Sequence, residues 1–233
     1  VRFVTDSSFK PEAYLLEITP QQILIKASDT KGFFYALQSI RQLLPAAIES
    51  EQPVQNIAWN VPAMIVRDEP RFGFRGLLLD PVRCFIPKEN VLRIIDCMAM
   101  LKINKLHFHL TDDNGWRIEI KKYPKLIEVG SKRKCSGLGW EWENDQFDNI
   151  PQAGHYTQED IKEIVAYAKK LNITIVPEIE ILTHSSAAIA SYPQLGTTKK
   201  QIEVECRMGV FSEIIDVSDD FAIQFMHDVL DEV

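Results

Sequence analysis

Asp80 and Arg83 lie at the end of a short segment, where their charged side chains could bind a polar ligand. The segment reads R-G-L-L-L-D-P-V-R, and both charged residues come directly after an apolar run. A guanidinium at such a position can donate paired hydrogen bonds to sugar hydroxyls or to a carboxylate. The alternative is a purely structural Asp80–Arg83 ion pair, and the spacing leaves both interpretations open.

A second segment, H-F-H-L-T-D-D-N-G-W-R, carries two histidines and two adjacent carboxylates. His107 and His109 are two residues apart, so on a strand their side chains share one face. There they could bind a metal ion or form hydrogen bonds within the protein interior. We find no further ligand spacing that completes a metalloenzyme set. Asp112 and Asp113 are more informative, because two carboxylates just after a strand are costly to bury unless they are paired or functional.

The third segment, P-E-I-E-I-L-T-H-S-S, places His184 four residues after Glu180. An imidazole at that distance from a strand-end carboxylate can orient or modulate a group that transfers protons. A histidine that is simply hydrogen-bonded within a loop is the alternative. No phosphate-binding glycine-rich loop, G-x-S-x-G motif or basic–aromatic patch accompanies these segments.

All three segments follow apolar runs that we expect to be strands, and runs with helical spacing separate them. The predicted strands cover residues 74–79, 103–110 and 173–177, and the predicted helices begin near residues 87, 157 and 219. This alternation is typical of parallel β/α units, whose carboxyl edge holds the ligand in barrels and in doubly wound sheets. We therefore predict an acidic cleft at this edge, with residues 114–156 as a long polar insertion.

The first 68 residues predict a separate small α+β unit. Residues 14–18 and 23–27 are β-type runs joined by a T-P-Q-Q turn, which favours a hairpin, and residues 30–44 have helical spacing. Residues 1–11 have no clear partner strand, so we expect the upstream part of this unit to be missing. Residues 46–71 predict a weakly periodic connection, with a domain boundary near residue 68.

Composition narrows the class of protein without identifying a ligand. The chain has 233 residues, a net charge of −7 and 45 % hydrophobic residues. These values are typical of a globular protein, and the acidic balance disfavours a nucleic-acid backbone as partner. No apolar run approaches the ~20 residues of a membrane-spanning helix. The four cysteines show no C-x-x-C spacing, which favours buried or incidental thiols over a zinc site.

Together, the three segments resemble the β-N-acetylhexosaminidases of glycoside hydrolase family 20. The patterns R-G-x-x-x-D-x-x-R, H-x-H-L-x-D-D-x-G-W-R and P-E-I-E-x-x-x-H-S-S-A stand in the order and at the spacing of that family. Residues 14–45 resemble its N-terminal α+β domain. The resemblance implies an α/β fold in which residues 1–68 form that domain and residues 69–233 form the first part of a (β/α)8 TIM barrel.

The resemblance also implies an activity and roles for particular residues. The family removes terminal N-acetylglucosamine or N-acetylgalactosamine with retention, using the substrate's own acetamido oxygen as nucleophile, without metal or cofactor. Arg83 matches the arginine that binds hydroxyls of the non-reducing sugar. Asp112 and His184 match the pair beside the catalytic Glu, and Glu180 matches the acidic residue that precedes the histidine loop. Asp80 matches a structural position at the rim.

Three departures from the family pattern change these expectations. Residues 181–183 are I-L-T where the family usually has Met-Pro-Gly, so we expect the loop to hold His184 differently. Cys84 stands where His, Asn or Tyr is common. The sequence contains no H-x-G-G-D-E motif, which carries the catalytic Asp–Glu pair of the family. Asp231 and Glu232 lie on a predicted helix and do not replace that pair, so we expect the chain alone to be inactive.

Two other functions stay open on the sequence alone. An inert carbohydrate-binding homologue is the main alternative, and a metal-dependent hydrolase that uses His107 and His109 is the other. The expected partner is a glycan that ends in N-acetylhexosamine, with no nucleic acid and no membrane-spanning segment. The chain begins at Val1 without a leader, so we expect a mature or excised chain, and the resemblance implies a secreted, periplasmic or lysosomal location.

Overall fold

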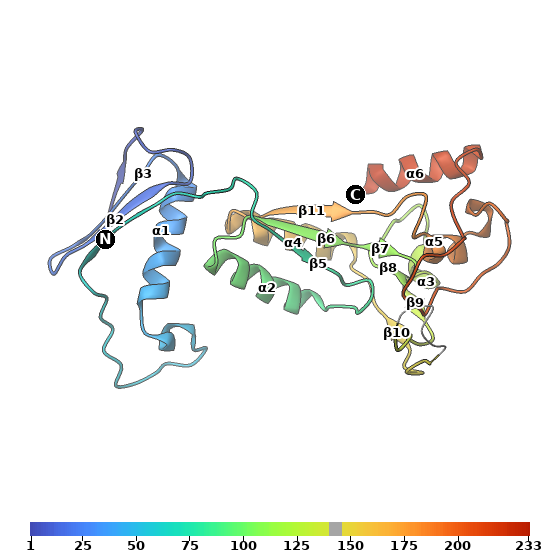
Figure 1. Cartoon of the computed structure of the whole chain (residues 1–233), viewed down its shortest axis with the longest axis horizontal. Coiled ribbons are helices and arrows are strands. Elements are labelled where there is room, and N and C mark those ends of the chain that lie inside the picture. The colour runs from blue at the N-terminus through green and yellow to red at the C-terminus, as the bar shows by residue number, and fades with distance from the viewer. Residues whose placement is uncertain (140–145) are drawn as a thin grey trace. The chain divides into compact units, whose positions relative to one another are not determined.

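The computed structural model describes residues 1–139 and 146–233, and these divide into two compact units (Figure 1). The first unit comprises residues 1–76, 94–105 and 169–173. The second comprises residues 77–93, 106–168 and 174–233.

The first unit contains a four-stranded sheet with the order β1-β3-β2-β4. Its strands are β1 (Arg2–Thr5), β2 (Tyr14–Ile18), β3 (Ile23–Ala27) and β4 (Met64–Asp68). Alternate residues of β2 are buried and share a hydrophobic core with residues of α1 (Thr30–Leu43). The hairpin and the helix were both predicted, and a short 3-10 helix follows at Ala46–Glu49.

Helix α1 begins where the sequence offers a cap. The Asp29 carboxylate accepts a hydrogen bond of 2.7 Å from the Gly32 amide, which satisfies one of the free amides of the first turn. Gly32 is required there, because a Cβ atom would lie 2.5 Å from the Ala13 carbonyl oxygen. The same residues therefore start the helix and seat it against the sheet.

Two predictions about this unit were wrong. Residues 1–11 were expected to have no partner strand, yet β1 pairs in parallel with β3, with Phe3 opposite Ile25. Residues 46–71 were expected to be a connection, yet β4 pairs antiparallel with β2, with Val66 opposite Leu16. Neither pairing is between strands adjacent along the chain, so no local turn signal reveals it.

The second sheet has the order β11-β6-β5 and carries the candidate site. Its strands are β5 (Gly76–Leu79), β6 (Lys105–His109) and β11 (Thr174–Glu178). Helix α2 (Lys88–Met100) connects β5 to β6, and α4 (Gln158–Lys170) lies between β6 and β11 along the chain. The observed strand bounds and helix starts lie within two residues of the predicted ones, so the α/β class is confirmed.

The three strands run in the same direction (Figure 1). The amide of Asn104, just before β6, donates to the carbonyl of Arg75, just before β5, at 2.9 Å. At the other end, the amide of Leu110, just after β6, donates at 3.1 Å to the carbonyl of Glu178, which ends β11. The start of β6 therefore lies beside the start of β5, and its end lies beside the end of β11. This parallel arrangement brings the loops after the three strands to the same edge of the sheet.

Short elements complete the chain. The insertion holds β7 (Thr111–Asp112), β8 (Gly115–Trp116), α3 (Lys125–Glu128), β9 (Lys132–Arg133) and β10 (Gln152–Ala153), and its residues 140–145 lie outside the described part. After β11 come α5 (Ser186–Ser191), a 3-10 turn (Pro193–Leu195) and α6 (Asp220–Glu232). Among the described helices, none is long and apolar enough to cross a membrane.

Candidate active site

The loops after β5, β6 and β11 meet at the carboxyl edge of the second sheet. Asp80 follows β5, Asp112 and Asp113 follow β6, and Glu180 follows β11 by two residues. The Thr111 hydroxyl accepts a 2.7 Å hydrogen bond from the Glu180 amide, which joins the last two loops. The three acidic segments singled out from the sequence are thus neighbours in space.

Arg83 bridges the loops after β5 and β6. Its Nη1 lies 2.9 Å from Asp80 Oδ2, and its Nη2 lies 2.6 Å from Asp112 Oδ2. Asp80 also accepts from the backbone amide of Arg83 at 3.2 Å, which closes the turn. The Asp80–Arg83 ion pair therefore exists, but the Arg83 side chain stays 32 % exposed and can still meet a ligand.

The backbone of the Arg83 loop is held by two buried arginines. Arg117 is fully buried and donates to the carbonyls of Pro81 at 3.1 Å and Val82 at 2.7 Å. Arg133 donates to the carbonyls of Val82 at 3.2 Å and Arg83 at 2.5 Å. These charge-assisted hydrogen bonds fix every carbonyl of residues 81–83. Neither arginine was singled out from the sequence, although G-W-R was part of the quoted motif.

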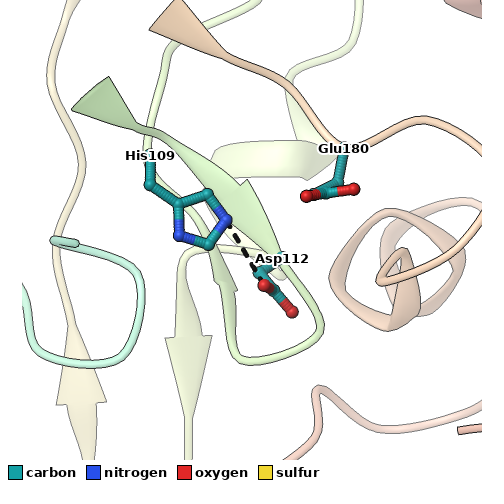
Figure 2. A group of neighbouring side chains, drawn as sticks. All are labelled: His109, Asp112 and Glu180. Carbon is teal, nitrogen blue, oxygen red and sulfur yellow. Dashed lines mark ion pairs between the residues drawn. The ribbon is translucent and has the colours of Figure 1, made fainter. Parts of the chain in front are cut away.

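His109 lies buried behind Arg83 and Asp112. Its Nε2 is 3.3 Å from Asp112 Oδ2, and its Nδ1 is 3.4 Å from Asp80 Oδ1 and 3.1 Å from Arg83 Nη1. Burial lowers the pKa of His109, but the close contacts with the Asp112 and Asp80 carboxylates outweigh it and raise the pKa to about 9. Figure 2 shows His109 on its strand beside Asp112. Of its two sequence-based interpretations, the hydrogen-bonded interior histidine fits this geometry.

The contact that raises the pKa of His109 lowers the pKa of Asp80. Burial raises its pKa, yet the hydrogen bond with His109 and the charge of Arg83 hold the pKa of Asp80 well below its usual range. Asp80 is therefore an anion at any working pH, which is consistent with the structural position expected for it.

His184 contacts both aspartates that follow β6, and the closer is Asp113. Its Nδ1 lies 2.9 Å from Asp113 Oδ2 and 3.4 Å from Asp112 Oδ1. Asp113 also accepts from the amide and the hydroxyl of Ser186 at 3.0 and 2.6 Å. The resemblance pairs His184 with Asp112, whereas here Asp112 mainly contacts Arg83 and Asp113 mainly holds the imidazole.

The His184 loop has a strained backbone. Leu182 has a φ of 95° and His184 a φ of 51°, in the region that residues with a Cβ rarely adopt. Leu182 and Thr183 stand where the family has Pro and Gly. Burial lowers the pKa of His184, but the hydrogen bond with Asp113 and the charges of Asp112 and Asp113 raise it further than burial lowers it.

Glu180, in the loop after β11, lies near His109 and Asp112 (Figure 2). Burial, a hydrogen bond with Glu178, and the charges of Glu178 and Asp112 all raise the pKa of Glu180. Glu178 itself contacts His107, with 2.6 Å between His107 Nε2 and Glu178 Oε2. Glu180 therefore holds a proton more readily than an isolated glutamate does.

Two groups of side chains offer ligand atoms that a metal ion could use. They are His109, Asp112 and Glu180, and Asp112, Asp113 and His184, each with ligand atoms within 4.8 Å of one another. The Arg83 guanidinium already lies 2.6 Å from Asp112, and its positive charge opposes a cation there. Within the described residues, neither group contains His107, so the proposed H-x-H pair does not converge on one metal position.

The site combines a hydrogen-bond donor held in place, Arg83, with a pair of side chains that can exchange a proton, Asp113 and His184. Arg83 can donate to hydroxyls of a polyol, and the Asp113–His184 pair can take up or release a proton next to it. A cavity of about 1070 Å³ is lined by the segments around Cys135 and Cys206 and also by Ser186, whose hydroxyl donates to Asp113.

Comparison with known proteins gives the family of sequences most similar to this chain. The model of the glycosyl hydrolase family 20 catalytic domain matches residues 72–233, and that of domain 2 of the same family matches residues 1–69. A β-hexosaminidase of Porphyromonas gingivalis is 41 % identical over 224 residues, which is 96 % of this chain and 27 % of that protein. The N,N'-diacetylchitobiase of Vibrio harveyi is 40 % identical over 188 residues, 78 % of this chain and 20 % of that protein.

Solved structures show the same similarity. A mutant Streptomyces plicatus β-hexosaminidase in complex with its product GlcNAc superposes with a TM-score of 0.85 at 33 % identity, covering 99 % of this chain and 44 % of that one. The chain thus spans about a quarter of the length of the Porphyromonas and Vibrio proteins and less than half of the Streptomyces structure.

Proposed function

The chain belongs to glycosyl hydrolase family 20, and on this premise we propose that the protein is an exo-β-N-acetylhexosaminidase. It would remove terminal β-linked N-acetylglucosamine or N-acetylgalactosamine from glycans. The observation that carries the proposal is Arg83, which is held by Asp80 and Asp112 with part of its guanidinium exposed at the carboxyl edge of the sheet. Related proteins named β-hexosaminidase and chitobiase support the same assignment.

We also propose that β5, β6 and β11 are the first three strands of a (β/α)8 barrel. Their order in the sheet follows their order in the chain, as in a barrel, whereas a doubly wound sheet reverses its strand order. Residues 1–68 would form the α+β domain and residues 69–233 the first part of the barrel. The two family matches, at residues 1–69 and 72–233, support this division.

The proposed mechanism is substrate-assisted hydrolysis with retention. The acetamido oxygen attacks the anomeric carbon to form an oxazolinium ion, while a glutamic acid protonates the leaving oxygen. In this chain Arg83 binds hydroxyls of the non-reducing sugar. His184, held by Asp113 and Asp112, modulates the acid through its charge and its hydrogen bonds. Glu180 and Asp80 would support Arg83, Asp112 and His184 without contacting the sugar.

The sequence lacks the H-x-G-G-D-E motif that supplies the acid and the acetamido-orienting aspartate in the family. We therefore propose that the 233-residue chain alone does not turn over substrate, whereas a full-length gene product with that motif does. Release of p-nitrophenol from p-nitrophenyl N-acetylglucosaminide by the purified 233-residue chain would contradict this.

The role of Arg83 is tested in the full-length gene product. Arg83→Ala removes the charged donor, so we expect kcat/KM for the same glycoside to fall by roughly 10- to 150-fold, the equivalent of about 1.5–3 kcal/mol, mainly through a higher KM. Arg93→Ala is the matched control, because Arg93 is an exposed arginine on α2, and it should leave kinetics unchanged. Unchanged KM and kcat/KM in Arg83→Ala would refute the assignment.

An inert carbohydrate-binding homologue is the second candidate, and the strained loop at residues 181–184 is the observation that favours it. Such a protein would bind N-acetylglucosamine without hydrolysing glycosides. Calorimetric binding of the sugar by a full-length gene product that has no H-x-G-G-D-E motif and no activity would support it. Turnover by the full-length product would exclude it.

A further inference from the structure

Two buried cysteines, Cys135 and Cys206, lie on neighbouring segments and line one cavity. Cys135 follows β9, and Cys206 lies in the long segment before α6. Their exposed fractions are 6 % and 7 %, and both residues line the same cavity. By contrast, Cys84 and Cys97 are exposed.

The backbones on either side of the two cysteines are also in contact. The Gly137 amide donates to the Cys206 carbonyl at 2.8 Å, and a Cβ atom on Gly137 would lie 3.3 Å from Arg207 Cα. A disulfide needs Cβ atoms about 4 Å apart and Cα atoms within ~7 Å, a separation that segments whose backbones are in direct contact can meet.

These two cysteines also differ from cysteines in a close-packed core because a small molecule can approach them through a cavity. Both line the cavity of about 1070 Å³, together with Glu205 and Arg207. A small-molecule oxidant can enter a cavity of that size, whereas a thiol enclosed in a close-packed core meets none.

We propose that Cys135 and Cys206 form a site of reversible oxidation, at which the two thiols join as an intramolecular disulfide. The oxidant is a low-molecular-weight disulfide such as oxidised glutathione. The Cys206 thiolate attacks one of its sulfurs, the S–S bond of the oxidant breaks, and one glutathione leaves. Cys135 then loses its proton and attacks the Cys206 sulfur, which releases the second glutathione. Two electrons pass from the cysteines to the oxidant, and the two thiol protons end on the two glutathiones.

The order of the two steps follows from the surroundings of Cys135. Burial and the adjacent Cys206 raise the pKa of the Cys135 thiol to about 11. Because the thiolate is the nucleophile, this raised pKa disfavours Cys135 as the first attacker, and we assign Cys135 to the second step.

The disulfide would join two segments that both contact the loops of the carboxyl edge. On one side, the Glu205 amide donates to the Asp113 carbonyl at 3.2 Å, and the Asn114 side chain donates to the Glu205 carbonyl at 3.0 Å. On the other side, Arg133, two residues before Cys135, donates to the carbonyls of Asn114 and Arg83 at 3.1 and 2.5 Å. Oxidation would therefore stiffen the support of these loops, whatever ligand they bind.

The experiment uses the full-length gene product, incubated with excess oxidised glutathione, blocked with an alkylating agent and digested without reduction. We expect a pair of peptides joined through Cys135 and Cys206, lighter by two hydrogen atoms than the separate peptides and absent after reduction. Cys84 and Cys97 should be alkylated throughout and serve as internal controls, because both are exposed.

A melting experiment provides the second measurement. Because the cross-link restricts the unfolded chain, oxidation should raise the apparent Tm by on the order of 5 °C. The Cys206→Ser variant should show no such rise. The proposal is overturned if Cys135 and Cys206 both remain alkylatable after oxidation and denaturation. It is equally overturned if Cys206 is found joined only to glutathione, Cys84 or Cys97. Neither outcome depends on hydrolase activity, so the proposed function is tested separately.

Discussion

The loops after β5 and β11 present their functional side chains in opposite ways. In the loop of residues 80–84, the backbone carbonyls that flank Arg83 accept hydrogen bonds from the buried side chains of Arg117 and Arg133. In the loop of residues 179–185, the backbone takes positive φ values at Leu182 and His184. The Leu182 carbonyl accepts one 2.9 Å hydrogen bond from the Ile215 amide.

This difference suits the two roles proposed for the loops. A guanidinium that recognises hydroxyls gains affinity when its position is set before the ligand arrives, because no ordering has to follow. An imidazole that modulates a proton must instead remain responsive to its surroundings, and strained backbone is often found at such positions. We therefore expect substitutions in the support of Arg83 to affect folding, and substitutions in the His184 loop to affect it much less.

The largest expected effect is the loss of Arg117. Arg117→Leu removes a charged hydrogen bond from each of four carbonyls, of which only those of Val82 and Ser131 keep a second donor, so we expect the free energy of unfolding to fall by about 3–5 kcal/mol. His184→Leu should cost only about 1 kcal/mol, because His184 is one-third exposed and Asp113 keeps its bonds to Ser186. Chemical denaturation of the full-length gene product measures both, with the exposed Arg93→Leu as control. Equal losses of unfolding free energy for Arg117→Leu and His184→Leu would contradict the proposed difference between the two loops.

The pH dependence of stability gives a second, smaller difference. The pKa of His109 is raised to about 9, so its contacts stabilise the fold fully below pH ~6.5, and the contribution is lost as pH rises toward 9. The difference in unfolding free energy between wild type and His109→Gln should therefore shrink by up to roughly 3 kcal/mol across that window. The pKa of His184 is also raised, but its greater exposure should make the corresponding change for His184→Gln smaller. A pH-independent difference for His109→Gln would show that its charge does not stabilise the fold.

The smallest expected effect is relief of strain in the His184 loop. Leu182→Gly should stabilise the protein by about 0.5–1 kcal/mol, because glycine adopts a φ of 95° without steric cost. The neighbouring Ile181→Gly is the matched control and should destabilise it, since Ile181 is not among the residues with positive φ. A denaturation midpoint that moves in the same direction for both variants would argue against stored strain at Leu182.

Sequence patterns were most reliable where the determining interactions are local. The strands of the second sheet and the starts of its helices were predicted to within two residues, because apolar periodicity and caps lie within each element. Strands β1 and β4 were not predicted, because their partners are remote in the chain. The buried roles of Arg117 and Arg133 were equally hidden, since a charged residue in sequence is normally read as exposed.

By itself, the sequence determined that acidic residues follow each strand of the second sheet, and it determined the family to which the chain belongs. Only the tertiary structure decided how those residues are paired: Asp112 with Arg83, and Asp113 most closely with His184. Asp112 and Asp113 are adjacent and identical in type, so no local pattern distinguishes them. Their carboxylates reach different loops, and which cation each meets depends on how the segments after β5 and β11 pack against the end of β6.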